Sequence, residues 1–266
     1  MLKYKLKLCP HLEDIKEMYL NNCTVSSIAK KYNCYEQSVI NALKYLKIYN
    51  PKPPNTTENP DYFKNINTYN KAYILGFIIA DGAIVRNSLG YPSLTITIHR
   101  RDISILELIK KELGVTNKII PINKPSSFNK TKITDHVRLV ICNQTIVNDL
   151  LLLGVKERKS LTMENIITII PEFYKPAFII GYFDGDGSVS LAKDSNTIIV
   201  NIRGTECFLR EISDFLMLEV FSIKQYDSIP RLAFASKKEI LKFFNLYKYT
   251  DFFLKRKYNK FKERIS

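Results

Sequence analysis

Two aspartates stand out for their chemistry in this chain of 266 residues, because each follows a largely apolar run and precedes a glycine. Asp81 follows the run at residues 74–80, and Asp186 follows the run at residues 179–185. Glycine often comes directly after the last helical residue, so each run is expected to form a helix that ends at its aspartate. A carboxylate there meets the negative end of the helix dipole and is stabilised by a cation. The two acids together therefore predict a metal site.

Small residues recur at every fourth position of both runs. Gly76 and Ala80 share one face of the first predicted helix, and Gly181 and Gly185 share one face of the second. Side chains this small let another helix approach to backbone contact. We therefore expect the two helices to pack against each other and to set the distance between the two acids.

The composition favours a globular protein with a polyanionic partner. Lysine and arginine number 40 against 26 acids, which gives a formal net charge of +14, and 45% of the residues are hydrophobic. The longest apolar run is too short to span a membrane, no signal-like segment follows the first residues, and the five cysteines lack a paired spacing. We expect a soluble protein with reduced thiols, in a bacterial or phage-infected cytoplasm or, as the alternative, in an organelle.

The first 50 residues predict three short helices, at residues 12–20, 25–32 and 36–46. The spacing of Ala29, Asn33 and Val39 matches a helix-turn-helix, and the segment resembles bacterial modules of that kind. The alternative is a three-helix cap without a ligand. If the segment binds DNA, the exposed positions of the third helix that could face bases or phosphates are Glu36, Gln37, Asn41 and Lys44.

Residues 51–68 are rich in proline, asparagine and threonine, a composition that favours a semi-stiff spacer. We place the domain boundary in this segment and expect it to pack into no core. The rest of the chain then divides into two repeats, at residues 69–165 and 166–266.

The pattern of each repeat predicts a helix, two strands, a second helix, two more strands and a third helix. The expected fold class is α+β, with two pseudo-symmetric αββαββα subdomains whose antiparallel sheets together form a saddle. Polar residues alternate with apolar ones along the predicted strands, and the polar face of each sheet is left open. Any one of these positions equally fits a solvated surface, but as a set they form a DNA-binding face: Asn87, Thr95, Thr97, His99, Arg138, Ser188, Ser190, Asn201, Arg203 and Arg231.

The two aspartate runs resemble the LAGLIDADG signature of homing endonucleases, in the form that carries two motifs on one chain. Residues 181–187 match the motif closely. The first run keeps Gly76, Ala80, Asp81 and the following glycine, but has Ile79 where the family often has an earlier acid. The resemblance extends from residue 69 to the C-terminus.

This resemblance implies a monomeric, site-specific endonuclease that cuts both strands of DNA and leaves 3′ overhangs. The final acids, Asp81 and Asp186, would bind divalent metal with help from the carbonyl oxygens of Ala80 and Gly185. Two or three Mg²⁺ ions are implied, with Mn²⁺ as a substitute, and the partner is a long double-stranded target that is pseudo-palindromic or asymmetric. The family also places a basic residue near the scissile phosphate, for which Arg100 and Arg203 are the candidates, with His99 as the alternative.

Two other functional hypotheses, a maturase and a transcription regulator, remain open, and a third, an intein, is disfavoured. A maturase that binds intron RNA could use the same scaffold and keep both acids. A transcription regulator would keep the fold and the helix-turn-helix but would not need Asp81 and Asp186. An intein is disfavoured, because the sequence lacks the terminal residues that such domains use. The C-terminal run at residues 253–262 mixes cations with aromatic residues and fits either a phosphate-binding segment or a solvated helix.

Overall fold

A computed structural model describes residues 8–21, 23–49, 55–87, 90–125, 133–155, 166–192, 197–226 and 229–265. The chain divides into two compact units, Met1–Lys52 and Pro53–Ser266. No helix within these described ranges is long and apolar enough to cross a membrane.

The first unit is a bundle of three helices, α1 (Leu12–Leu20), α2 (Val25–Lys31) and α3 (Glu36–Tyr45), preceded by the short helix η1 (Cys9–His11). Its core is made of apolar side chains from all three helices, among them Ile15, Ile28, Val39 and Leu43. The helices lie where the sequence predicted them, because each presents its apolar residues at helical spacing.

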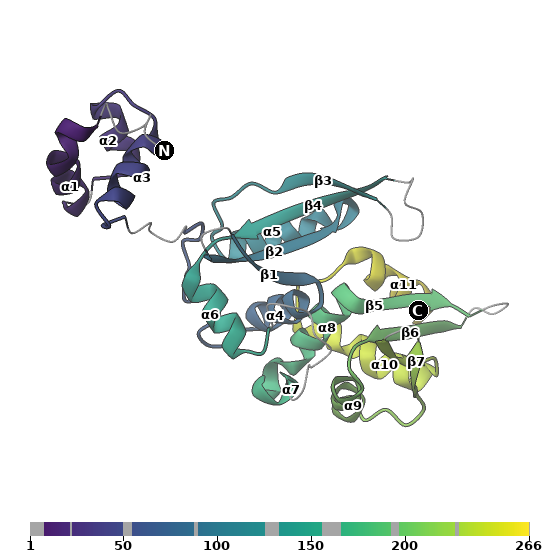
Figure 1. Cartoon of the computed structure of the whole chain (residues 1–266). Helices are drawn as coiled ribbons and strands as arrows, with labels where there is room; N and C mark the ends of the chain where they lie inside the picture. The colour runs from purple at the N-terminus through teal and green to yellow at the C-terminus, as the bar shows by residue number, and fades with distance from the viewer. Residues whose placement is uncertain are drawn as a thin grey trace. The chain divides into compact units, whose positions relative to one another are not determined.

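The second unit contains two repeats with the same order of elements (Figure 1). The first has α4 (Tyr69–Asp81), β1 (Gly82–Arg86), β2 (Pro92–His99), η2 (Arg100–Asp102), α5 (Ile103–Glu112), β3 (Ile120–Pro125), β4 (Ile133–Ile141) and α6 (Gln144–Leu152). The second has α8 (Lys175–Asp186), β5 (Gly187–Leu191), β6 (Ile198–Arg203), α9 (Glu206–Phe215), β7 (Ser222–Tyr226), β8 (Ile229–Phe234) and α10 (Lys237–Phe244). Short helices α7 (Ile166–Ile169) and η3 (Glu172–Tyr174) precede α8, and η4 (Asn245–Tyr249) and α11 (Lys255–Ile265) follow α10.

Each repeat forms a four-stranded antiparallel sheet, with strand orders β1-β2-β4-β3 and β5-β6-β8-β7. The apolar residues of the strands face the helices and the polar residues line the opposite face, which we call the open face. The predicted α+β fold class, with two αββαββα subdomains, is confirmed.

The strand register shows which positions of the two repeats correspond. The first strand of each sheet begins with a glycine, and these glycines pair with Ile96 and Ile202. The next residues, Thr97 and Arg203, pair with Arg138 and Arg231. Thr97 therefore corresponds to Arg203, and Arg138 to Arg231.

The helices α4 and α8 pack side by side at the centre of this unit (Figure 1). A Cβ atom added to Gly76 would lie 2.1 Å from the carbonyl oxygen of Phe178, and one added to Gly181 would lie 2.0 Å from the carbonyl oxygen of Tyr73. The contact is reciprocal, since each glycine meets the residue three positions before the other. Backbone therefore touches backbone, as the small residues predicted.

Residues 55–68 differ from the expected spacer. Thr57 forms a β-bridge with Val115, and its neighbour Thr56 donates its backbone N–H to the carbonyl of Cys142 at 2.8 Å. Tyr62 and Phe63 are buried in the main core. The expectation failed for this stretch because its backbone is bonded to the ends of repeat-one elements, which composition does not reveal. Residues 51–54 lie outside the described ranges.

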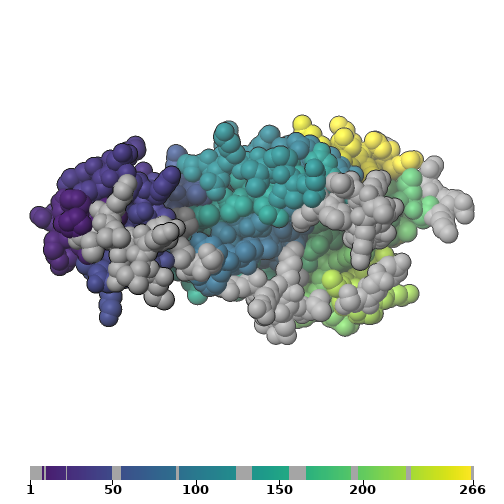
Figure 2. Space-filling view, turned by 45° about the horizontal axis from the view of Figure 1, so that its top comes forward, coloured from purple at the N-terminus to yellow at the C-terminus, as the bar shows by residue number. Residues whose placement is uncertain are grey.

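The C-terminal helix α11 packs one face against the core and leaves the other face exposed to solvent. Its Phe261 is fully buried, and Lys257 is only 3% exposed. The Arg256 guanidinium forms two hydrogen bonds with the Asp102 carboxylate, at 2.8 and 2.9 Å, and so joins the end of the chain to the first repeat. Figure 2 shows the yellow C-terminal residues against the teal surface of that repeat.

Candidate active site

The two predicted acids lie at equivalent places in the two repeats. Asp81 is the last residue of α4 and Asp186 is the last residue of α8, and in each case a strand begins at the next residue, a glycine. Both acids are half-buried. Because α4 and α8 are packed in parallel, with their C-terminal ends together, these ends present the acids to one region.

The C-terminal ends of α4 and α8 are in close contact near the two acids. A Cβ atom added to Gly185 would lie 2.3 Å from the Cβ atom of Ala80 and 3.2 Å from Oδ2 of Asp81. The Asp81 carboxylate therefore lies directly beside the residue that precedes Asp186. A larger side chain at Gly185 would push the two acids apart.

Tyr182 lies close enough to both acids for their charges to affect its phenol. This side chain is buried, and its hydroxyl donates a hydrogen bond to the carbonyl oxygen of Arg203 at 2.7 Å. Burial raises the pKa of the Tyr182 phenol well above its usual value, and the negative charges of Asp186 and Asp81 raise this pKa further. The same hydroxyl is thus influenced by both carboxylates and links α8 to the end of β6 through its hydrogen bond.

Asp184 has a structural environment that differs from that of the metal-site candidates. It is 2% exposed, and its Oδ2 accepts hydrogen bonds from the Tyr73 hydroxyl and the Leu254 backbone N–H, both at 2.7 Å. Burial raises the pKa of the Asp184 carboxyl to about 6, against the opposing effect of the Lys257 charge. This carboxylate docks the C-terminal segment onto α8.

The mismatch in the first motif follows from this environment. Ile79 holds the position that corresponds to Asp184, two residues before the final acid, and it belongs to the apolar core. The C-terminal segment runs past α8, where Leu254 meets Asp184. An earlier acid is therefore used in the second motif, whereas an apolar residue packs in the first.

Lys257 closes the end of α8 and was not among the sequence candidates. Its ammonium donates hydrogen bonds to the carbonyl oxygens of Phe183, Asp184 and Gly187, at 2.7, 2.7 and 2.6 Å. Burial lowers the pKa of this amine to about 8, although the charges of Asp184 and Asp81 favour its protonated form. A buried ammonium that binds helix-end carbonyls is well placed to hold the second motif in position.

The two arginines predicted to lie near the scissile phosphate have different surroundings. Arg100 lies in η2, after β2 has ended, and its Nε donates to Oδ2 of Asp135 at 2.6 Å. Arg203 is the exposed last residue of β6, next to the Tyr182 hydroxyl that its own carbonyl binds. His99 is exposed at the end of β2, and its Nδ1 accepts a hydrogen bond from the Arg101 backbone N–H at 3.2 Å. Their roles in DNA cleavage stay predictions.

The predicted DNA-binding residues of the second unit lie at the surface of their sheets. Asn87 sits in the β1–β2 turn, where its side chain accepts a hydrogen bond from the Tyr91 backbone N–H at 3.0 Å. The remaining positions are half-buried or exposed and alternate with buried apolar residues along the strands: Thr95, Thr97, His99, Arg138, Ser188, Ser190, Asn201, Arg203 and Arg231. Gln37, Asn41 and Lys44 are exposed on α3 of the first unit.

A row of cations crosses the open face of the second sheet. Lys224 of β7 stands opposite Arg231 of β8, and Arg231 stands opposite Arg203 of β6. Sequence reasoning found the two arginines but missed Lys224, because the pairing of β7 with β8 cannot be read from the sequence. Like charges placed directly opposite one another destabilise a sheet. Such a row suits an anionic ligand.

The residues at the helix ends fit Mg²⁺ that is shared with a ligand. They offer two carboxylates, of Asp81 and Asp186, and the backbone carbonyls before them, so all donors are oxygen atoms, as Mg²⁺ prefers. Over the described ranges, histidine, cysteine and acidic residues form no cluster of three that could hold a metal. Mg²⁺ usually keeps several waters and is bound by one or two carboxylates plus substrate phosphates, so a pair of acids is sufficient.

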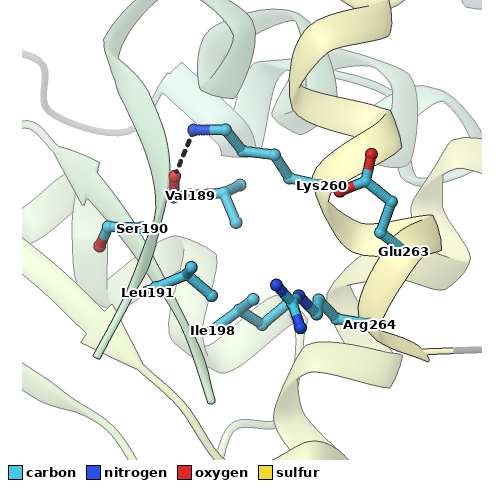
Figure 3. Close-up of a pocket in the computed structure, with 7 residues that line it drawn as sticks. All are labelled: Val189, Ser190, Leu191, Ile198, Lys260, Glu263 and Arg264. Carbon is cyan, nitrogen blue, oxygen red and sulfur yellow. Dashed lines mark hydrogen bonds between the residues drawn. The ribbon is translucent and has the colours of Figure 1, made fainter. Parts of the chain in front are cut away.

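A cavity of about 280 Å³ lies between the β5–β6 hairpin and α11 (Figure 3). Val189, Leu191 and Ile198 give it apolar walls, and Lys260 spans it to donate a hydrogen bond to the Val189 carbonyl at 3.0 Å. The cavity contains neither of the two acids. Its relevance to the site is that Lys260 fastens α11 to the strand that follows Asp186.

Comparisons with known proteins bear on this architecture. The family described as LAGLIDADG-like domain matches residues 174–247, which run from the end of η3 into η4. A search of curated proteins gave no match. The search of solved structures found the homing endonuclease I-WcaI bound to its DNA recognition sequence, with a TM-score of 0.54 and 15% identity over 77% of this chain and 91% of that chain.

Two further structures are similar at lower scores. The I-LtrWI LAGLIDADG homing endonuclease bound to target DNA has a TM-score of 0.47 and 17% identity, over 77% of this chain and 90% of that one. The LAGLIDADG meganuclease I-AabMI bound to uncleaved DNA has a TM-score of 0.47 and 14% identity, over 72% and 87%. Residues 174–247 thus resemble a LAGLIDADG-like domain, and the 77% of this chain that is covered by I-WcaI shares the fold of that homing endonuclease.

Proposed function

We propose that this chain is a site-specific DNA endonuclease that hydrolyses one phosphodiester bond in each strand of a long double-stranded target and leaves 3′ overhangs. The observation that carries the proposal is the convergence of Asp81 and Asp186 at the paired ends of α4 and α8. Each repeat contributes one acid and one open sheet face, so a single monomer can act on both strands of a duplex.

Asp81 and Asp186, with the carbonyl oxygens of Ala80 and Gly185, would hold Mg²⁺, for which Mn²⁺ would substitute. When bound, the metal supplies an activated water and neutralises negative charge that develops on the phosphate and on the leaving 3′ oxygen. The protein positions the acids through rigid backbone contact between the helices. Lys257 holds the end of α8, and Tyr182 holds Arg203 at the edge of the site.

The open faces would bind the DNA on either side of the cleavage position. Arg203, Arg231 and Lys224 form a cationic row that can neutralise phosphates or donate to guanine in the major groove. In the first sheet, Nε of Arg138 donates to Oγ1 of Thr97 at 3.0 Å, so this guanidinium is held in one orientation. An arginine held in one orientation can form the bidentate contact with guanine O6 and N7 that reads sequence.

Cleavage of a randomised double-stranded DNA library in Mg²⁺ tests the proposal. The unmutated protein should cut a small set of sequences, with activity lost in EDTA and restored by Mg²⁺ or Mn²⁺. Asp81→Asn and Asp186→Asn should each reduce cleavage by several orders of magnitude while DNA binding persists, because the amide keeps the size of the carboxylate but weakens metal binding. Glu107→Gln is the matched control, since Glu107 is an exposed acid of α5.

Two outcomes would reject this function. Sequence-specific binding without cleavage by the unmutated protein would instead indicate a transcription regulator. Tighter binding to structured RNA than to any DNA in the library, again without DNA cleavage, would indicate a maturase. The strand ends produced by cleavage are read by end-labelling, and blunt or 5′ ends would reject the assignment of 3′ overhangs.

A further inference from the structure

The first unit has the local geometry of a helix-turn-helix. The N-cap residue of α2, Thr24, accepts a hydrogen bond from the Ser27 backbone N–H at 3.1 Å. Ala29 is 4% exposed at the point where α2 meets α3, and Asn33 adopts a φ of 45° in the turn between them. Asparagine tolerates this left-handed conformation better than most residues, so the turn is encoded locally.

The helix that follows this turn divides its residues between a core face and a solvent face. Val39, Ala42 and Leu43 are buried in the core of the unit. Gln37 and Asn41 are exposed one turn apart on the other face. The core of the unit therefore uses only one side of α3 and leaves the other side available for a ligand.

The two exposed amides are ordered by each other. Nε2 of Gln37 donates a hydrogen bond to Oδ1 of Asn41 at 3.0 Å. This bond uses one N–H of Gln37 and one lone pair of Asn41, so the Gln37 carbonyl remains an acceptor and the Asn41 NH₂ group remains a donor. The major-groove edge of adenine presents the complementary groups, an N6–H donor and an N7 acceptor, side by side.

The neighbouring side chains fit a DNA ligand. Lys44 lies about one turn further along α3 and is exposed, where an ammonium can contact a phosphate. Glu36, at the start of the helix, excludes phosphates from its immediate surroundings and can accept a hydrogen bond from the N4 amino group of cytosine. We propose that the first unit is a second, separate DNA-reading module, in which the paired amides of Gln37 and Asn41 on α3 select an adenine in the major groove.

An identical amide pair elsewhere in the chain serves as the control. Nε2 of Gln144 donates to Oδ1 of Asn148 at 2.8 Å, also at a spacing of four residues and on an exposed helix face. This pair lies on α6 and follows no helix-turn-helix, so there it acts only as a helix-stabilising contact. Loss of either pair should have the same small effect on stability, but only the α3 pair should affect sequence choice.

The experiment is a binding selection with the full chain and randomised double-stranded DNA in EDTA, so that cleavage does not occur. The unmutated protein should enrich a long block of sequence and a separate short block that contains adenine. Gln37→Ala/Asn41→Ala should lose the short block and bind the selected DNA about tenfold more weakly, the effect of one good amide–base contact. Gln144→Ala/Asn148→Ala should enrich both blocks unchanged.

Asn41→Asp gives a second, isosteric test, because a carboxylate cannot donate to adenine N7, and it too should lose the short block. Persistence of the block in both α3 variants, or its absence with the unmutated protein, would overturn the proposal. The outcome is separate from that of the proposed nuclease function, since the selection runs without metal and Asp81→Asn, which should lose cleavage, should still enrich both blocks.

Discussion

The two repeats share one topology and one strand register, yet their chemistry differs at equivalent positions. In the first sheet the row of residues on the open face is Ile120, Arg138 and Thr97, and in the second it is Lys224, Arg231 and Arg203. The first row therefore contains one cation, whereas the second row contains three. The fold tolerates both rows because they lie on the face that its core does not use.

The C-terminal ends of α4 and α8 also differ, and again the second repeat has more charged groups than the first. The second motif has a buried carboxylate, Asp184, and a buried ammonium, Lys257, that bind the C-terminal segment to α8. The first motif has Ile79 within the apolar core. The symmetric part of the molecule is thus the helix pair that sets the acid spacing, while the asymmetric parts lie around it. Unequal halves suit a target whose two halves differ in sequence.

The first prediction breaks the symmetric part. Gly76→Ala and Gly181→Ala should each lower the free energy of unfolding by about 3 kcal/mol or more, because the added methyl group would meet a backbone carbonyl that cannot rotate away. The two effects should be equal within error, since the contacts at the two glycines are reciprocal, at 2.1 and 2.0 Å. Urea denaturation followed by circular dichroism measures both.

Gly90→Ala is a suitable comparison for these variants, because a Cβ atom there would meet nothing within 4 Å, although a φ of 84° adds some strain. A much larger loss at one of the central glycines than at the other would show that the helix interface is not equivalent on its two sides.

The second prediction concerns pH and the acid that only the second motif has. The pKa of Asp184 is raised from its ordinary value of 3.8 to about 6, so the folded protein holds this proton more tightly than the unfolded chain does. The stability that this group contributes is therefore greatest below about pH 4 and is lost as the pH rises through 6. A shift of about 2 units corresponds to at most about 3 kcal/mol.

The measurement is the difference in unfolding free energy between the unmutated protein and Asp184→Asn at several pH values from 4 to 7. This difference should move in favour of the asparagine variant as the pH rises. A flat curve for Asp184→Asn would mean that the buried carboxyl titrates as it does in water.

The third prediction removes the cation that closes α8. Lys257→Met keeps most of the side-chain volume but leaves three helix-end carbonyls without their donor, which should cost about 2 kcal/mol of stability. Because the three carbonyls that this ammonium binds all belong to the second motif, cleavage of the two DNA strands should become unequal and nicked DNA should accumulate. Equal slowing of both strands would show that Lys257 serves the whole fold and not one half of the site.

Sequence reasoning found the parts of the structure that depend on local pattern. The paired helices, their terminal acids and the open sheet faces all follow from periodicity and from small residues at fixed spacing. Lys257 could not be found in this way, because its partners are backbone carbonyls about 70 residues earlier, and the pattern around it equally fits a solvated helix. The packing of Tyr62 and Phe63 was missed for a related reason, since the prolines and asparagines around them dominate the composition.

The last prediction sharpens the comparison of the two cation rows. Lys224→Met should weaken DNA binding by about tenfold at low salt and reduce the slope of log K against log salt by about 1, because one phosphate contact is lost. The same change should slightly raise protein stability, by about 0.5 kcal/mol, since it relieves repulsion from Arg231 across the sheet. Ile120→Lys, at the corresponding position of the first sheet, should do the reverse: bind DNA more tightly and unfold more easily. Salt titrations measure the DNA affinity and its salt slope for each variant, and urea denaturation measures the free energy of unfolding of each. If both substitutions changed affinity without changing the salt slope, the rows would act through base contacts and the difference between the repeats would lie in sequence choice alone.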